Sequence, residues 1–298
     1  MVKIQLQIKL NLRIGTIASK QLEMNMLIQR GFAMNKLKGK TVIITGASSG
    51  IGRSTVFDFV KQQVKSIVLV SRNKERLSEV SSEIRGKCES MVFACDVSNK
   101  TEVLKMAKDV LSVHDVDILV NNAGIGILGD VANQSIGDME SVTKTNYFGM
   151  IYCTKAFLDP MLRKKNGHIV NVASLAASFG IPGLAAYCGS KFAMLGFSES
   201  LRHELHGTGV SVTVVSPIGV KTNFFHHPSF GNKFKSKERF YLDPISVSKA
   251  IIRACTSNRL EIVVPFYMRG GIWLKHTIPY LVDPIVGTSF RKILDIKN

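Results

Sequence analysis

The segment Thr41-Val-Ile-Ile-Thr-Gly-Ala-Ser-Ser-Gly-Ile-Gly52 decides the fold of this chain. Its β-branched run at 42–44 predicts a short buried strand. Three glycines follow at the spacing G-x-x-x-G-x-G, namely Gly46, Gly50 and Gly52. The residues after them predict a helix that ends at Lys61. A strand, a glycine turn and a helix N-terminus together form a pyrophosphate site, because the backbone can approach the anion and offer it free N–H groups.

The remainder of the chain alternates predicted strands with predicted helices. The patterns predict strands over 66–70, 91–95, 117–120, 168–172, 210–215 and 261–264. They predict helices over 73–85, 100–112, 135–158 and 187–206, and one that begins at Asp243. We expect the long helix over 135–158 to end before Pro160. Such alternation favours an α/β fold with a Rossmann-type, doubly wound, parallel seven-stranded sheet and helices on both faces.

Polar landmarks follow the glycine turn in a fixed order. They are Asp96, Asn121-Asn-Ala-Gly124, Asn146, Ser174 and Tyr187-Cys-Gly-Ser-Lys191, with thirteen residues from Ser174 to Tyr187. In order and spacing they resemble the short-chain dehydrogenase/reductase family, in its single-domain branch. The resemblance covers roughly residues 40–265. It implies an oxidoreductase that passes a hydride between a nicotinamide cofactor and a carbonyl or alcohol carbon.

The pair Tyr187 and Lys191 is the expected centre of the chemistry. Four residues separate them, so a helix would present both on one face. A phenol with a reference pKa of about 10 exchanges protons poorly near neutral pH, and a nearby cation lowers that pKa. The resemblance implies Tyr187 as general acid/base and Lys191 as its partner, which also holds the nicotinamide ribose. It implies Ser174 as hydrogen-bond partner of the substrate oxygen and Asn146 as holder of a water.

The resemblance also implies a set of cofactor contacts along the strand ends. The expected ligands are Gly46, Ser48, Ser49, Gly50, Ile51, Gly52, Arg72, Asp96, Val97, Asn122, Ala123, Gly124, Tyr187, Lys191, Pro217 and Thr222. Asn121 is expected beside the adenosine, where it would steady the sheet. The family commonly has Pro-Gly after the sixth strand, whereas this chain has Ile218 after Pro217. That departure leaves the position of Thr222 less constrained than the others.

The end of the second predicted strand decides the cofactor. It carries Ser71-Arg72 and no acid. A carboxylate there holds the ribose 2′-hydroxyl of NAD, whereas a guanidinium pairs with the 2′-phosphate of NADP. Ser48 and Ser49 would add hydroxyl contacts, and Arg53 a second positive charge. We therefore expect NADP(H) in preference to NAD(H), with a solvated surface role for Arg72 as the alternative.

Composition restricts the partners. The 298 residues are 45% hydrophobic and carry a net charge of +17, which favours anionic partners. The sequence has no helix-turn-helix, zinc or aromatic-basic pattern, so nucleic acid ranks below a phosphorylated cofactor or an acidic membrane surface. Five cysteines without a C-x-x-C pair favour reduced thiols in the cytoplasm, and the seven histidines lack metal-site spacing, so we expect no metal.

The two ends of the chain lie outside the family pattern. We divide the chain into a basic N-terminal extension (1–39), a catalytic domain (40–265) and an apolar, basic C-terminal tail (266–298). Eight Lys or Arg stand against one Glu in the first 40 residues. This extension is either an amphipathic arm or an over-long start, with the true initiator at Met24, Met26 or Met34. The tail would lie on a membrane, or pack on the body or on a second subunit.

The expected function is NADPH-dependent reduction of a ketone or aldehyde, or the reverse oxidation. The segment 222–242 would form a substrate lid whose phenylalanines favour an apolar substrate, namely Phe224, Phe225, Phe230 and Phe234. We expect a cytoplasmic homodimer or homotetramer, with peripheral membrane contact as a variant. Two alternatives stay open: a membrane-associated reductase of lipid or steroid-like ketones, and a non-catalytic scaffold that binds the cofactor. The sequence does not name the physiological substrate or the direction.

Overall fold

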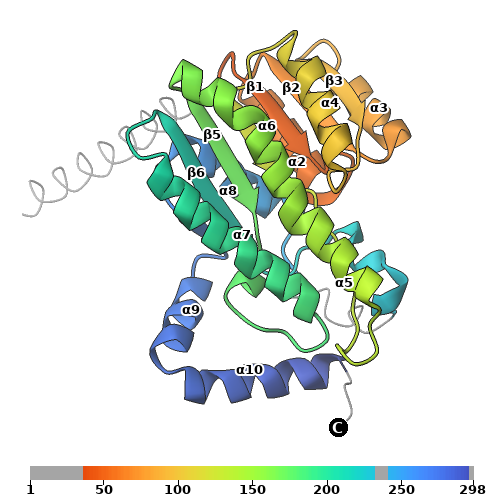
Figure 1. Ribbon diagram of the computed structural model, residues 1–298, viewed down its shortest axis with the longest axis vertical. Helices are drawn as coiled ribbons and strands as arrows, with labels where there is room; N and C mark the ends of the chain where they lie inside the picture. The colour runs from red at the N-terminus through yellow and green to blue at the C-terminus, as the bar shows by residue number, and fades with distance from the viewer. Residues whose placement is uncertain (1–35, 232–240, 295–298) are drawn as a thin grey trace, which may run out of the picture.

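The computed structural model describes residues 36–231 and 241–294. Within them, seven strands form one parallel sheet in the order β3-β2-β1-β4-β5-β6-β7 (Figure 1). The strands are β1 (Thr41–Thr45), β2 (Ser66–Ser71), β3 (Glu89–Ala94), β4 (Ile118–Asn121), β5 (Gly167–Val172), β6 (Val210–Pro217) and β7 (Glu261–Val264). The direction of winding reverses between β1 and β4, and ligands bind at the carboxyl ends of strands beside such a point. The predicted Rossmann-type sheet is confirmed.

Helices cover both faces of this sheet (Figure 1). One face packs against α2 (Gly50–Lys61), α3 (Lys74–Glu83) and α8 (Pro244–Thr256). The other packs against α4 (Lys100–Leu111), α6 (Gly149–Lys164) and α7 (Ala185–Glu204). Val42 and Ile44 of β1 join the first core cluster, and Ile43 joins the second. Successive strand side chains point to opposite faces, so an uninterrupted apolar run is what a doubly covered strand requires.

The predicted helix over 135–158 differs from the structure in two ways. The chain forms α5 (Ile136–Thr143), a π-helical turn η1 (Lys144–Phe148), and then α6. The helix continues past Pro160 to Lys164, so the prediction that it ends before Pro160 is wrong. An internal proline removes one helical hydrogen bond. Burial of Phe157 and Met161 of the same helix against the sheet offsets that loss.

The chain after β7 forms two helices, α9 (Met268–Thr277) and α10 (Pro279–Leu294). They lie beyond the carboxyl edge of the sheet (Figure 1). Three short 3₁₀ turns lie nearer that edge: η2 (Leu175–Ala177), η3 (Asn223–His226) and η4 (Pro228–Phe230). Most of the predicted N-terminal extension and Phe234 of the predicted lid lie outside the described residues.

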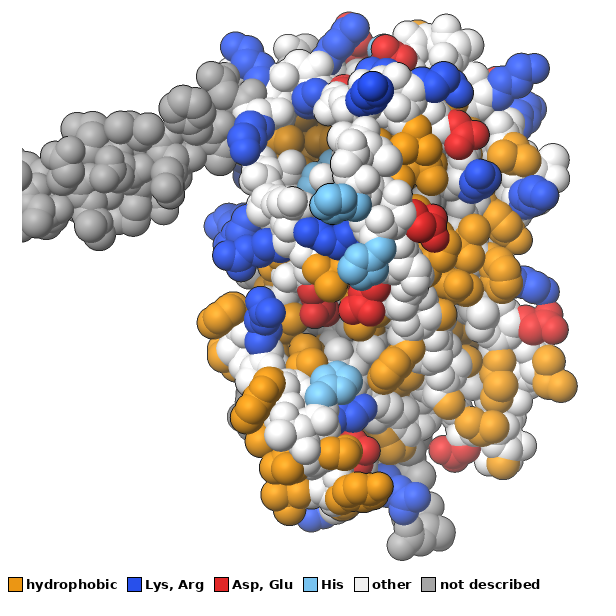
Figure 2. Space-filling model, turned by 60° about the vertical axis from the view of Figure 1, so that its left-hand side comes forward, with side chains coloured by type: hydrophobic (Ala, Val, Ile, Leu, Met, Phe, Trp, Pro, Cys, Tyr) orange, Lys and Arg blue, Asp and Glu red, His pale blue; other side chains and the backbone are white. Residues whose placement is uncertain are grey.

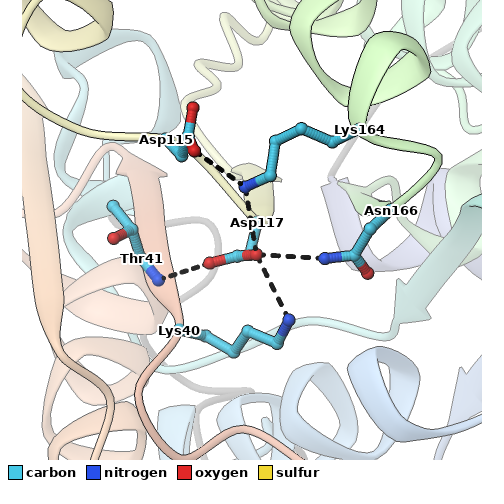
Figure 3. Close-up of polar contacts among 6 residues, drawn as sticks. All are labelled: Lys40, Thr41, Asp115, Asp117, Lys164 and Asn166. Atoms are coloured by element: carbon cyan, nitrogen blue, oxygen red, sulfur yellow. Dashed lines mark hydrogen bonds and ion pairs between the residues drawn. The ribbon is translucent and has the colours of Figure 1, made fainter.

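The amino edge of the sheet is tied together by Asp117, which directly precedes β4 (Figure 3). Its carboxylate accepts hydrogen bonds from the Thr41 backbone N–H (2.9 Å), Lys40 Nζ (3.2 Å) and Asn166 Nδ2 (3.1 Å). The ammonium group of Lys164 lies 3.6 Å from the same carboxylate. These contacts join the starts of β1, β4 and β5. We call this group the Asp117 clamp.

Candidate active site

The glycine turn forms a cradle at the carboxyl end of β1. The predicted ligands Gly46, Ser48, Ser49, Gly50, Ile51 and Gly52 all lie in this turn or in the first turn of α2. Gly46 has a φ of +68°, which glycine adopts without strain, and a Cβ on Gly52 would collide with the Gly46 carbonyl oxygen. Ser49 occupies the N-cap of α2 without a side-chain capping bond, and the first turn carries no acid. The open N–H groups therefore fit a pyrophosphate.

Thr222 lies beside this cradle despite the unusual loop after β6. A Cβ on Gly50 would approach Thr222 Cγ2 to 2.8 Å, so the two segments are in close contact. Pro217 ends β6, and the Ile218 N–H donates to the Val264 carbonyl of β7 (2.9 Å). Ile218 therefore continues the strand pairing, and the loop still returns Thr222 to the glycine turn.

Thr45 holds the end of β4 against the end of β1. Its hydroxyl accepts hydrogen bonds from the backbone N–H groups of Asn122 (2.9 Å) and Ala123 (3.0 Å). The Asn122 side chain donates back to the Thr45 carbonyl (2.9 Å). Asn121 donates to Asn171 Oδ1 of β5 (2.9 Å), as expected of a residue that steadies the sheet. The sequence analysis missed Thr45, because a threonine in a β-branched strand carries no further signal.

The predicted adenine contacts lie after β3. The Asp96 carboxylate accepts hydrogen bonds from the backbone N–H (2.9 Å) and hydroxyl (2.8 Å) of Ser98, which shapes the turn. Val97 is buried, and its side chain packs so closely on Gly149 that a Cβ there would lie 2.8 Å away. Both residues lie at the carboxyl edge of the sheet, on the β2–β3 side of the cradle.

The two arginines near the predicted 2′-phosphate site differ in their surroundings. Arg72 is exposed just after β2, and its guanidinium has no hydrogen-bond or ion-pair partner in the described part of the chain. Arg53 of α2 pairs with Glu83 at the end of α3, with nitrogen–oxygen distances of 2.8 and 2.7 Å, and stacks on Phe57. Arg53, expected to add a second positive charge, is thus paired with an acid, whereas Arg72 is not paired with one among the described residues.

Tyr187 and Lys191 project from the N-terminal half of α7. Lys191 Nζ lies 5.7 Å from the centre of the Tyr187 ring and donates to the Val172 carbonyl at the end of β5 (2.9 Å). Burial lowers the pKa of Lys191 to about 7. Burial raises the pKa of Tyr187 to about 12, and a hydrogen bond with Ser174 opposes that rise. Ser174 also donates to the Pro217 carbonyl (3.4 Å).

Asn146 lies in the π-helical turn η1 and is fully buried. Its amide donates to the Ile125 carbonyl and to the Ser190 hydroxyl, both at 3.0 Å, and its oxygen accepts from the Ile125 N–H (2.8 Å). Ser190 in turn donates to the Tyr187 carbonyl (2.7 Å). A π turn inside a helix frequently marks a functional site. Ser190 was missed, although its place three residues after Tyr187 was a usable signal.

The structure brings these separate motifs to one place. A Cβ on Gly124 would lie 3.2 Å from Asn146 Oδ1 and 3.6 Å from Lys191 Nζ. The Tyr187 ring lies 5.2 Å from the ring of Phe224, centre to centre. Phe224 and Phe225 both pack on buried Phe230, and these three predicted lid aromatics belong to the same apolar cluster as Tyr187.

This combination of a nucleotide cradle, a doubly wound sheet and a Ser-Tyr-Lys group defines a nicotinamide-dependent oxidoreductase. A family model described as short chain dehydrogenase matches residues 40–229, and the chain belongs to that family. Its members act on hydroxyl and carbonyl groups.

Similar proteins include steroid dehydrogenases. The chain is 35% identical over 246 residues to 17-beta-hydroxysteroid dehydrogenase 13 of Mus musculus, a match that covers 80% of this chain and 77% of the relative. It is 40% identical over 196 residues to estradiol 17-beta-dehydrogenase 11 of Homo sapiens, covering 64% and 65%.

Solved structures share the fold. A short-chain dehydrogenase/reductase from Burkholderia phymatum in complex with NAD has a TM-score of 0.75 and 26% identity, covering 83% of this chain and 96% of that one. A serine dehydrogenase complexed with NADP+ has a TM-score of 0.69 and 29% identity, covering 75% and 93%. One neighbour binds NAD and the other NADP+, so these structures support a nicotinamide cofactor without choosing between the two.

Three further features bear on the sequence predictions. In the described ranges, no helix combines the length and apolar character that a membrane span requires. Those same ranges contain no group of three or more His, Cys, Asp or Glu placed to hold a metal ion. All five cysteines are free thiols.

Proposed function

We propose that the protein is an NADP(H)-dependent carbonyl reductase, or the reverse alcohol dehydrogenase, with Tyr187 as general acid/base. The observation that carries the proposal is the placement of Tyr187 beside Ser174 and Lys191, at the same sheet edge as the glycine cradle. A nicotinamide cofactor held by that cradle would supply or accept the hydride. The protein itself then has to supply or accept one proton and to position the substrate oxygen.

Tyr187 would give its phenolic proton to the substrate oxygen during reduction. Burial raises the pKa of Tyr187 to about 12, so the isolated phenol holds its proton too firmly. Lys191 counters this, because a positive charge beside the ring favours the phenolate. With its own pKa lowered to about 7, Lys191 is partly neutral near neutral pH, and it can take up a proton from solvent water as negative charge develops on the phenol. Ser174 would hold the substrate oxygen in line, since a well-oriented donor lowers the barrier.

The preference for NADP(H) rests on Arg72. An exposed guanidinium that has no partner among residues 36–231 and 241–294 can pair with a 2′-phosphate, whereas Arg53 is already engaged by Glu83. The proposal is tested by measuring kcat/KM for a panel of ketones and aldehydes with NADPH and with NADH. Turnover with NADPH as the better cofactor is expected. A wild-type enzyme that binds NADPH and reduces no carbonyl would support the scaffold alternative instead.

A second candidate places the enzyme on a membrane, where it would reduce a lipid or steroid-like ketone. The chain from 266 onward exposes large apolar side chains, which are Phe266, Tyr267, Trp273, Leu274, Ile278, Tyr280, Leu281 and Ile285. They gather at the lower end of the molecule over α9 and α10 (Figure 2). Tyr280 is 96% exposed. Exposed aromatics together with the basic Arg291 suit a membrane interface.

Co-sedimentation with anionic vesicles tests this second candidate. The double variant Trp273→Ser/Tyr280→Ser should lose binding, because each aromatic inserts at the headgroup level. Val113→Ser is a matched control, since Val113 is 64% exposed and lies between α4 and β4, at the amino edge of the sheet. A wild-type protein that stays in the supernatant would count against the membrane. Its apolar helices would then cover a second subunit, which sedimentation velocity would detect.

A further inference from the structure

Lys275 connects α9 to the chain segment that follows Ser174. Its ammonium group donates to the carbonyl oxygen of Ser178, with an Nζ–O distance of 2.6 Å. The same nitrogen lies 5.3 Å from the centre of the Phe179 ring and 5.6 Å from that of Phe192 on α7. Only 17% of the Lys275 side chain is exposed. The charge is therefore enclosed between α9, α7 and the segment after β5.

The carbonyl that Lys275 holds belongs to the same short turn as Ser174. Ser174 is the N-cap of η2, and its hydroxyl accepts from the Ala176 N–H (3.1 Å). The Ala177 N–H donates to the Ser174 carbonyl, and the Ser178 N–H donates to the Leu175 carbonyl, both at 2.9 Å. Since η2 spans three residues, a shift at its carbonyl end is transmitted to Ser174 at the other end. A lysine near the last carbonyls of a helical turn stabilises them.

The surroundings of Lys275 call for a donor rather than for bulk alone. An apolar side chain of similar length would also pack between the two phenylalanine rings. It would leave the Ser178 carbonyl, in a residue that is only 4% exposed, without this donor. In the described side chains of α9 and α10 no residue is buried, and Lys275 supplies a polar contact between these helices and the body. Asp283 of α10 lies 3.9 Å from the same ammonium group and joins the two helices.

We infer that Lys275 is a positioning residue for Ser174, and through Ser174 for the substrate oxygen. The inference rests on the proposed function, in which Ser174 contacts the substrate. It makes α9 part of the catalytic arrangement without contact to cofactor or substrate. The cofactor cradle lies after β1, so the loss of Lys275 acts on turnover and leaves cofactor binding unchanged.

The test compares Lys275→Met, Lys275→Arg and a matched control, Lys292→Met, on the exposed surface of α10. Lys275→Met should lower kcat on the order of 10-fold, because a small displacement of a positioned group is costly in rate. The Kd for NADPH should not change. Lys275→Arg keeps a cation and a donor and should recover most of the rate, and Lys292→Met should match the wild type.

A double-mutant cycle shows whether Lys275 acts through Ser174. In a Ser174→Ala background, Lys275→Met should cause no further loss of kcat, because the group that it positions is gone. An equal loss in both backgrounds would overturn the inference, and so would a wild-type kcat in Lys275→Met alone. These outcomes separate positioning from a general effect on folding.

A measurement without turnover keeps the inference distinct from the proposed function. If the wild type reduces no carbonyl, the proposed function fails. The contact is then judged by hydrogen exchange of the amides at 176–179. Faster exchange in Lys275→Met than in Lys292→Met supports a link between α9 and η2, and equal exchange in the two variants overturns it.

Discussion

The two edges of the parallel sheet use polar residues in opposite ways. At the amino edge, the Asp117 clamp satisfies a carboxylate with a backbone N–H, a lysine and an asparagine. At the carboxyl edge, α2 begins without a side-chain cap, and Arg72 has no partner in the described ranges. Groups left open in this way reduce stability but are available to a ligand. The polar groups at the amino edge therefore stabilise the fold, whereas those at the carboxyl edge stay available for a ligand.

The largest expected effect is on kcat. It follows from the removal of one oxygen at the carboxyl edge, the hydroxyl oxygen of Tyr187. Tyr187→Phe keeps the ring against Phe224 and removes the proton that the substrate oxygen needs. We expect kcat to fall by about 10²–10⁴-fold, as is typical for loss of a general acid. Cofactor affinity and the free energy of unfolding should stay near the wild-type values. Stopped-flow kinetics measures kcat, and fluorescence titration with NADPH measures cofactor affinity. Wild-type turnover in this variant would refute the role of Tyr187.

The removal of the Asp117 carboxylate at the amino edge should lower stability and leave turnover nearly unchanged. Asp117→Ala leaves the Thr41 N–H and Asn166 without their acceptor. It also removes the carboxylate that pairs with Lys40 and Lys164. We expect the free energy of unfolding to fall by about 2–3 kcal/mol, with kcat nearly unchanged below the unfolding temperature. Urea unfolding provides the measurement. Asp115→Ala is the matched control, since the Asp115 side chain is 76% exposed, and equal losses in the two variants would contradict the clamp.

The preference between NADPH and NADH tests the role of one group at the carboxyl edge, the Arg72 guanidinium. In Ser71→Asp/Arg72→Ala, a carboxylate would accept the 2′-hydroxyl of NAD, and the guanidinium that is proposed to pair with the 2′-phosphate is lost. A charge-assisted bond of about 1.5–3 kcal/mol corresponds to roughly 10–150-fold in affinity, so the ratio of kcat/KM values should reverse toward NADH. Added salt should weaken the wild-type preference, because Arg72 is exposed. An unchanged ratio of kcat/KM values would show that the 2′-phosphate does not bind at Arg72.

The smallest expected effect, counted per pH unit, is the change of the free energy of unfolding with pH. Burial lowers the pKa of Lys191 from 10.5 to about 7, so the unfolded chain binds more protons than the folded one between these values. The contribution of Lys191 to the free energy of unfolding therefore rises with pH across this window, by at most about 1.4 kcal/mol per pH unit. The free energy of unfolding of the wild type, taken relative to that of Lys191→Met, should rise from about pH 7.5 to 9.5, below the titration of Tyr187. Lys249→Met, on the exposed side of α8, should show no such trend. A constant difference for Lys191→Met would contradict its desolvation.

The features that sequence reasoning predicted well are those encoded within a few residues. The run at 42–44 and the glycines after it predicted the first strand, turn and helix. The four-residue step from Tyr187 to Lys191 predicted that both lie on one helix face. Asn146 was recognisable as a poor helix former inside a helix, although its π turn was not. Each of these depends on local periodicity or local backbone conformation, which a short segment carries by itself.

Other features depend on partners that are distant in sequence. Arg53 was expected to add a second positive charge, and nothing in the sequence indicated that α3 brings Glu83 against it across 30 positions. Lys275 appeared as one of several basic residues in an apolar tail, and it reaches Ser178 across 97 positions. Pro160 was expected to end a helix that burial of Phe157 and Met161 instead sustains.

By itself, then, the sequence determined the doubly wound sheet and the glycine turn after its first strand, because strand alternation and glycine spacing are local properties. The Ser-Tyr-Lys group was predicted from the resemblance to a family, and its role stays a prediction. The tertiary structure alone decided which polar groups are satisfied. Asp117 is saturated because β1, β4 and β5 begin side by side, and Lys191 has a lowered pKa because the packing of α7 removes it from water. Hydrogen-bond satisfaction and desolvation depend on the complete set of neighbours, and only packing supplies that set.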